Sequence, residues 1–336
     1  MTEYSERIQY IRDQLGQRLH ILAHHYQCDE VVRHADSVGD SLELARRIPS
    51  LHAEYIVMCG VFFMAETASV LAGQGQRVYL PDREAGCTLA DLAPARMVEA
   101  TLRNLSRDGA RIVPLAYVNT SSAVKAICGR YGGSVCTSAN AETMLQWALQ
   151  QGDGVLFLPD KNLALNTADR LGIPETRRDF LLHPQKAEKG TVYIWPGICD
   201  VHTAFRVEEI RKIRESEPQA RVIVHPECPP ELVRMADASG STSQIIAYAE
   251  QSAPGSRIYV GTEINLVLRL GRHFAAEKSV VPLQASDCPF MARVTEDRLA
   301  ATLEALREGR AEQVAVDSAE ASWAKEAVNR MLEVCS

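Results

Sequence analysis

Residues 19–26 read LHILAHHY, residues 112–119 read IVPLAYVN and residues 221–228 read RVIVHPEC. Each stretch is a short apolar run, typical of a strand buried in a parallel sheet, that ends in two polar side chains at positions i and i+2. Because alternate side chains of an extended segment face the same side, we expect the members of each pair to point in one direction. The pairs are His24 and Tyr26, Tyr117 and Asn119, and His225 and Glu227.

These stretches open three copies of one longer pattern. After each pair come a hydroxyl side chain, a second apolar run that ends in a turn, a third apolar run and a cysteine. The interval from pair to cysteine is 63 residues in the first copy (24 to 87) and in the third (225 to 288), and 82 residues in the second (117 to 199), which carries extra residues near 129–134 and 180–189. A repeat of this length indicates one structural unit used three times. The hydroxyls are those of Ser41, Ser138 and Thr242, and the cysteines are Cys87, Cys199 and Cys288.

Strand-like and helix-like segments alternate along the chain, which predicts parallel sheets with right-handed crossovers. The predicted fold is α/β, with three similar αβα domains that contain small parallel sheets and surround a pseudo-threefold axis. Ligands bind at the carboxyl ends of parallel strands, where the repeat places its pairs, hydroxyls and cysteines, so this arrangement would bring them to one central site. We divide the sequence into an N-terminal helix (1–18), three units (19–105, 106–206 and 207–300) and C-terminal helices (301–336).

Composition indicates an ordinary soluble globular chain. The 336 residues are 46% hydrophobic and 24% charged, and the net charge is −7. An acidic chain has no general attraction for nucleic acid or anionic membranes. Residues 1–18 are charged throughout and lack the apolar core of a signal peptide, and no run approaches the ~18–20 apolar residues that span a bilayer. We therefore expect a cytoplasmic protein with neither a nucleic-acid nor a membrane partner.

Nine cysteines are many for a reducing compartment, where disulfides are rare. Three thiolates that converge from three units could hold a [4Fe–4S] cluster and leave one iron open to substrate as a Lewis acid. The alternative is that these cysteines are structural, because free cysteine is among the most buried residue types. Among the other cysteines, Cys59 and Cys136 lie in apolar runs and are predicted to be core, and Cys128 is predicted to lie on a helix.

Twelve motifs in order along residues 21–291 resemble the quinolinate synthase family. Any one of them alone is a weak signal, whereas all twelve in the family's order are specific. They are ILAHHYQ (21–27), VGDSLELA (38–45), GVFFMAETA (60–68), LPDREAGCTLADL (80–92), YVNTS (117–121), CTSAN (136–140), FLPDKNL (157–163), WPGICDVH (195–202), HPEC (225–228), SGSTS (239–243), GTE (261–263) and DCPFM (287–291).

The resemblance implies three αβα domains around a pseudo-threefold axis and a transferase- or dehydratase-type enzyme of de novo NAD biosynthesis. Enzymes of this family condense iminoaspartate with dihydroxyacetone phosphate and form quinolinate, with loss of phosphate and water. The resemblance also implies a [4Fe–4S] cluster bound by one cysteine from each domain, which match Cys87, Cys199 and Cys288 here. It points to L-aspartate oxidase as the supplier of iminoaspartate.

Matching motifs also carry over site residues. The resemblance implies acid–base or substrate-positioning roles for four residues and substrate-binding roles for seven more. The first set is His24, Tyr26, His225 and Glu227, and the second is Ser41, Tyr117, Asn119, Ser138, His202, Ser241 and Thr242. For each hydroxyl alone, plain N-capping of the following helix is an equally good interpretation.

Two other classes of protein fit parts of the pattern. The radical enzyme of diphthamide synthesis also uses three domains with one cysteine each, but it would need S-adenosylmethionine and a protein substrate. The three polar pairs suit small polyanions better. A non-catalytic iron–sulfur sensor would need a surface for nucleic acid or a partner, which the acidic composition does not indicate.

Overall fold

The computed structural model describes residues 2–181 and 189–336, so residues 182–188 of the second copy's insert lie outside it. The described residues form two compact units. The first runs to Cys87 and resumes at Asp287–Asp317, and the second comprises the described parts of Thr88–Ser286 and Ser318–Ser336. Each unit is therefore built from two separate stretches of sequence.

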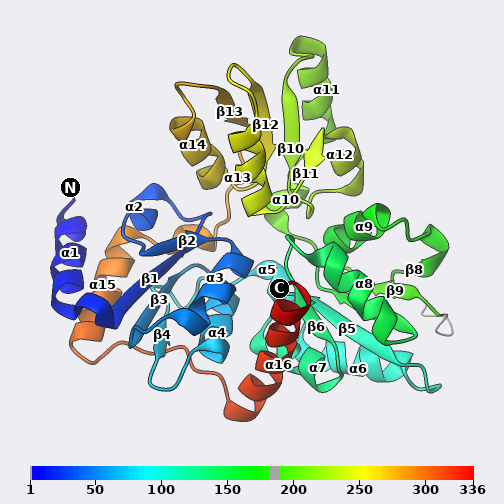
Figure 1. Ribbon diagram of the computed structural model, residues 1–336, viewed down its shortest axis with the longest axis horizontal. Coiled ribbons are helices and arrows are strands. Elements are labelled where there is room, and N and C mark those ends of the chain that lie inside the picture. The colour runs from blue at the N-terminus through cyan, green and yellow to red at the C-terminus, as the bar shows by residue number, and fades with distance from the viewer. Residues whose placement is uncertain (1, 182–188) are drawn as a thin grey trace. The chain divides into compact units, whose positions relative to one another are not determined.

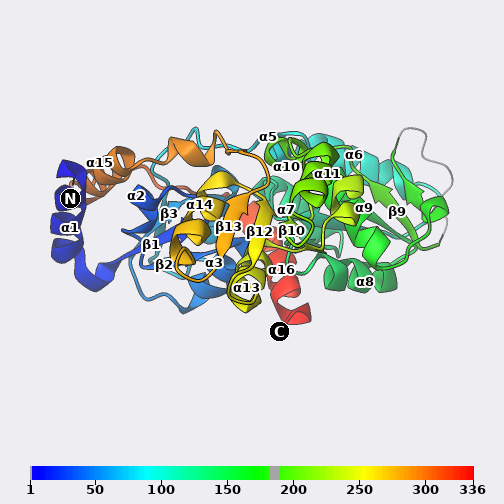
Figure 2. The same ribbon diagram turned by 90° about the horizontal axis from the view of Figure 1, so that it is seen from above.

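The first unit contains one four-stranded parallel sheet in the order β2-β1-β3-β4 (Figure 1). On one face, Ile8 and Ile11 of α1 and Leu299 and Leu303 of α15 pack with Ile21 in an apolar core. Figure 2 shows α1 and α15 lying side by side. The elements are α1 (Glu3–Leu15), β1 (Leu19–His24), α2 (Asp29–Val32), β2 (Ser37–Gly39), α3 (Ser41–Arg47), β3 (Tyr55–Cys59), α4 (Phe62–Leu71), β4 (Arg77–Tyr79) and α15 (Glu296–Arg307).

The second unit contains two parallel sheets. The five-stranded sheet has the order β6-β5-β7-β9-β8. Its strands are β5 (Ile112–Tyr117), β6 (Ser134–Cys136), β7 (Gly154–Leu158), β8 (Arg178–Asp179) and β9 (Thr191–Ile194), and its helices are α5 (Thr88–Asp91), α6 (Ala95–Leu105), α7 (Ser122–Arg130), α8 (Ala141–Gln151), α9 (Lys161–Arg170) and α16 (Ser318–Val334).

The four-stranded sheet of the second unit has the order β11-β10-β12-β13. Its apolar core includes Ile210 and Ile213 of α11, Val222 and Val224 of β10 and Leu232 of α12. The elements are α10 (Asp200–Thr203), α11 (Val207–Ser216), β10 (Arg221–Val224), α12 (Pro230–Met235), β11 (Ala238–Ser239), α13 (Thr242–Gln251), β12 (Arg257–Gly261), α14 (Ile264–His273) and β13 (Ser279–Pro282).

All three sheets share one strand order. The strand that leads into the polar pair is always second, between a short edge strand and the strand that leads into the turn. All of the strand pairings are parallel. The prediction of an α/β fold with three small parallel sheets is therefore confirmed. The pseudo-threefold arrangement and the five-part division of the sequence stay predictions.

No helix of the described residues is both long enough and apolar enough to cross a bilayer. This finding concerns helices alone.

The last helix, α16, packs against the five-stranded sheet and its helix α7. Ser134 of β6 donates a hydrogen bond from its hydroxyl to the carbonyl oxygen of Ala327 at 3.0 Å, and Ser122 of α7 donates to the Glu320 carboxylate. The backbones approach closely at Gly129, where an added methyl group would lie 1.9 Å from the carbonyl oxygen of Trp323. A side chain at position 129 would therefore force α16 away from α7.

We predict that Gly129→Ala destabilises the second unit by about 1–3 kcal/mol, the usual cost of overpacking. Thermal and denaturant unfolding would measure the loss. The matched control is Gly73→Ala, which adds the same methyl group where the nearest atom lies 3.4 Å away. Equal stability of the Gly129 variant and the wild type would contradict the close packing of α16.

Candidate active site

The predicted site residues lie at the carboxyl ends of the strands, as the repeat requires. Four predicted residues of the second unit form one group, in which Glu227 contacts both histidines: Ser138, His202, His225 and Glu227. Its Oε2 atom lies 2.8 Å from Nδ1 of His202 and 3.2 Å from Nδ1 of His225. The two imidazole rings stack with centroids 4.3 Å apart. All three side chains are buried, with 2% of each residue exposed.

The outer nitrogens of both histidines also have partners. Nε2 of His202 lies 3.1 Å from Oγ1 of Thr262, and Nε2 of His225 lies 3.2 Å from Oγ of Ser138. Nδ1 of His202 lies 3.3 Å from Sγ of Cys199. Because each ring is held from two sides, its orientation is fixed before any ligand binds.

The charge of the site is set by two buried acids. Burial raises the pKa of Glu227, but the two imidazoles outweigh it and lower that pKa to about 2. Burial and the nearby charge of Glu227 raise the pKa of Asp160 well above its ordinary value. Burial and the charge of Glu227 therefore favour the neutral form of Asp160, whereas the two imidazoles favour the ionised form of Glu227.

Helix α9 fixes the backbone that carries these residues. Nδ2 of Asn166 donates to the carbonyl oxygens of Pro226 at 2.8 Å and Cys228 at 2.9 Å, and Nδ2 of Asn162 donates to that of Glu227 at 3.1 Å. Three successive peptide groups of the loop after β10 are therefore bound by two buried amides.

The start of α9 also binds the loop before Cys199. Asp160 is the N-cap of α9, where its Oδ1 accepts from the Leu163 amide at 2.6 Å. The Lys161 amide donates to the carbonyl oxygen of Gly197 at 2.8 Å. Position 197 requires glycine, because a methyl group there would lie 2.4 Å from the carbonyl oxygen of Pro159. One helix end thus positions both loops of the site.

Other predicted residues of the second unit lie at the ends of its strands or the starts of its helices. Tyr117 ends β5 and is buried, and the amide oxygen of Asn119 is buried without a hydrogen bond from the described residues. Ser241 is the N-cap of α13 in a capping box with Gln244, so the capping interpretation holds for Ser241. Thr242, the first residue of that helix, is buried.

In the first unit, the predicted pair forms an edge-on contact. The rings of His24 and Tyr26 meet at 78° with centroids 4.5 Å apart, and His24 is buried. Ser41 is the first residue of α3, but the N-cap is Asp40, whose Oδ1 accepts from the amides of Leu42 and Glu43, each at 2.9 Å. Plain N-capping therefore does not explain Ser41.

Cys87 and Cys288 belong to the first unit, on segments that contact each other. A methyl group added at Gly86 would lie 3.7 Å from the Phe290 ring, and Nε of Arg293 donates to Oδ2 of Asp82 at 2.8 Å. Cys199 belongs to the second unit. That all three sulfurs meet at one point stays a prediction.

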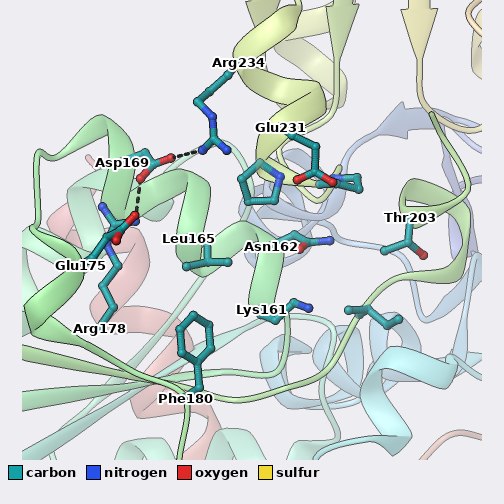
Figure 3. Close-up of a pocket in the computed structure, with 13 residues that line it drawn as sticks. Lys161, Asn162, Leu165, Asp169, Glu175, Arg178, Phe180, Thr203, Glu231 and Arg234 are labelled. Atoms are coloured by element: carbon teal, nitrogen blue, oxygen red, sulfur yellow. Dashed lines mark hydrogen bonds and ion pairs between the residues drawn. The ribbon is translucent and has the colours of Figure 1, made fainter. Parts of the chain in front are cut away.

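A cavity of about 600 Å³ adjoins the loops of the second unit that carry the site (Figure 3). Asp169 lies in it between Arg178 at 2.6 Å and Arg234 at 3.0 Å. Its lining includes Ile198, Thr203 and Pro229, the neighbours of the site residues, but none of Cys199, His202 and Glu227. The cavity is therefore separate from the histidine–glutamate group.

Two residues of the site were missed from the sequence. Thr262 lies in the GTE motif (261–263), but that motif assigns no role to its side chain. Asn166 belongs to no motif and looks like any polar helix residue. Its role depends on contact with a loop 60 residues away, for which a single sequence offers no signal.

Comparison with known proteins agrees with this arrangement. A family model described as "Quinolinate synthetase A protein" matches residues 6–333. The quinolinate synthase of Geobacillus thermodenitrificans is 43% identical over 342 residues, which cover 98% of this chain and 93% of the relative. That of Bacillus velezensis is 43% identical over 344 residues (98% and 93%), and that of Streptomyces coelicolor is 42% identical over 342 residues (97% and 87%). Because these matches span nearly the whole sequence, the chain belongs to the quinolinate synthase family.

Proposed function

We propose that this chain is a quinolinate synthase of de novo NAD biosynthesis, which condenses iminoaspartate with dihydroxyacetone phosphate and releases quinolinate, phosphate and water. The observation that carries the proposal is the buried, ionised Glu227 between two imidazoles and beside Cys199, in a chain of this family. L-aspartate oxidase would supply iminoaspartate, and the cytoplasm is the proposed compartment.

The cysteines fit the cofactor that the family implies. Thiolates are the usual ligands of a [4Fe–4S] cluster, and Cys87, Cys199 and Cys288 are each partly exposed just beyond a strand. In contrast, Cys59, Cys128, Cys136 and Cys228 are buried, and burial raises the pKa of each thiol. We propose that the first three hold the cluster, which supplies a Lewis-acid iron when bound.

We propose that Glu227, His225 and His202 of the second unit carry out or support proton transfer. The condensation requires removal of protons from carbon and nitrogen and protonation of departing oxygen. The ionised Glu227 carboxylate can stabilise positive charge on His225 through Nδ1, so His225 can accept or return a proton at Nε2, beside Ser138. His202 fixes the position of the Glu227 carboxylate and faces Cys199.

Substrate binding is assigned to polar groups at the strand ends. The substrates are anions with two carboxylates and a phosphate, which suit hydroxyl donors and helix N-termini. We propose that Tyr117, Asn119 and Ser138 contact the diacid. Five further residues would complete the site: Ser41, Ser241 and Thr242 as anion ligands, and the His24–Tyr26 pair as an acid–base and positioning group.

Glu227→Gln is expected to lower the rate of quinolinate formation by about 10²–10⁴-fold, the usual contribution of a general base. The amide keeps the shape of the side chain but lacks the negative charge that the proton transfer requires. Visible absorbance of the reconstituted cluster should be unchanged, because the three cysteines stay in place. Glu231→Gln, an exposed acid four residues away, is the control and should keep full activity. Wild-type turnover in Glu227→Gln would remove this residue from the mechanism.

Alanine at Cys87, Cys199 or Cys288 is expected to abolish cluster assembly, measured as iron and sulfide content after anaerobic reconstitution. Cys59→Ala and Cys335→Ala should retain the cluster, because Cys59 is enclosed in the core and Cys335 lies near the end of the chain. Equal cluster content in all five variants would defeat the ligand assignment.

Asn166→Leu removes two hydrogen bonds to the loop of His225 and Glu227 with little change in shape. We expect kcat to fall about 100-fold, the effect of a displacement of about 1 Å in a catalytic group, while KM changes little. Asn104→Leu, a substitution of the same kind on α6, is the control. An unchanged kcat in Asn166→Leu would show that the loop needs no support from α9.

A further inference from the structure

Cys199, His202 and Glu227 offer one sulfur, one nitrogen and one oxygen atom that all lie within 4.8 Å of one another. All three residues belong to the second unit. Cys199 is the N-cap of α10, His202 lies on that helix, and Glu227 lies in the loop after β10. The group is thus complete without any residue of the first unit.

The spacing of these atoms is close to that of a tetrahedral metal site. With Zn–N and Zn–O near 2.0 Å and Zn–S near 2.3 Å, tetrahedral angles place nitrogen and oxygen about 3.3 Å apart and nitrogen and sulfur about 3.5 Å apart. In this chain Nδ1 of His202 lies 2.8 Å from Oε2 of Glu227 and 3.3 Å from Sγ of Cys199. These two separations would have to grow by about 0.5 Å and 0.2 Å to admit the ion. The third, between the ligand atoms of Cys199 and Glu227, is at most 4.8 Å.

The surroundings of the group also suit a cation. Oε1 of Glu227 is buried and accepts no hydrogen bond from the described residues, so a negative oxygen there lacks a donor. Thr262 lies 3.1 Å from Nε2 of His202, where it can accept the ring proton and leave the lone pair on Nδ1. Histidines that bind metal ions in proteins usually donate a hydrogen bond from their other ring nitrogen to a nearby oxygen atom.

We propose that the protein without its cluster binds a single Zn²⁺-like divalent cation through Cys199, His202 and Glu227, with the fourth position open to water. One thiolate with one imidazole and one carboxylate favours Zn²⁺ or Co²⁺ over the hard cations Mg²⁺ and Ca²⁺. Because Cys199 is also a proposed cluster ligand, this ion and the cluster exclude each other. The inference goes beyond the proposed function, since it concerns a state that does not turn over.

Co²⁺ tests the site directly, because its bands report both the thiolate ligand and tetrahedral geometry. Chelator-treated, cluster-free full-length protein would be titrated with Co²⁺ anaerobically, and Zn²⁺ would then be titrated against a chromophoric chelator. We expect one equivalent of Co²⁺, a thiolate-to-cobalt charge-transfer band, and displacement by Zn²⁺. Cys199→Ala should remove the charge-transfer band and weaken Zn²⁺ binding at least 100-fold, and His202→Ala should weaken it to a similar degree.

The matched controls are Cys87→Ala and Cys288→Ala, which remove the other two proposed cluster ligands. Each should bind Zn²⁺ as tightly as the wild type and show the same Co²⁺ spectrum. Loss of the band in these two variants, or its retention in Cys199→Ala, would overturn the proposal. Circular dichroism would confirm that each variant is folded. If His202→Ala does not fold, Glu227→Gln replaces it as the second ligand variant.

A second readout tests the competition. Protein preloaded with one equivalent of Zn²⁺ should take up less iron and sulfide than cluster-free protein, and a chelator added first should restore the uptake. Equal uptake with and without Zn²⁺ would show that the ion does not occupy Cys199. Neither readout depends on turnover, so failure of the metal site and failure of the proposed function would be recognised separately.

Discussion

The buried negative charge of Glu227 is the constraint on which the arrangement of the second unit depends. Removing a carboxylate from water costs several kcal/mol unless partners replace the lost hydration. Here His202 and His225 both face the same oxygen atom, and this common partner brings their rings into a stack. Their outer nitrogens reach Ser138 after β6 and Thr262 after β12. One charge therefore links the ends of strands from two sheets.

Helix α9 holds the two loops of the site in place through hydrogen bonds to their backbones. Side chains near its start bind the backbone of the loop after β10, and its first amide binds the loop before Cys199. Asp160, the N-cap of α9, is buried, and the nearby charge of Glu227 favours its neutral form. The loops are thus positioned by backbone contacts, which leaves their side chains available for chemistry.

The central strands and the polar pairs after them could be predicted from the sequence, because they depend on patterns within a few neighbouring residues. Apolar runs of four to six residues marked the central strands, and the i, i+2 pairs marked where His225 and Glu227 share a side. The edge strands β2, β8 and β11 could not be predicted, because each has only two or three residues and at most one large apolar side chain (SVG, RD and AS). Cys199 and His202 were found through the repeat and the family motifs.

The amide contacts of Asn162 and Asn166 could not be found, since a polar helix residue looks the same whether it faces water or a buried loop. The Ser241 hydroxyl caps α13, as the capping interpretation predicts, and its role in ligand binding stays a prediction.

The order in which the sequence supplies each unit affects how the protein is made. The first unit needs residues 287–317, and the second needs α16, which ends at Val334. Domains made of one continuous stretch can fold while the rest of the chain is still being synthesised. Here the ribosome must add about 200 residues after Cys87 (87 to 287) before the second stretch of the first unit begins to appear. Folding of each unit is thereby delayed until its second stretch has been synthesised, and truncation before Ser318 would leave the five-stranded sheet without α16.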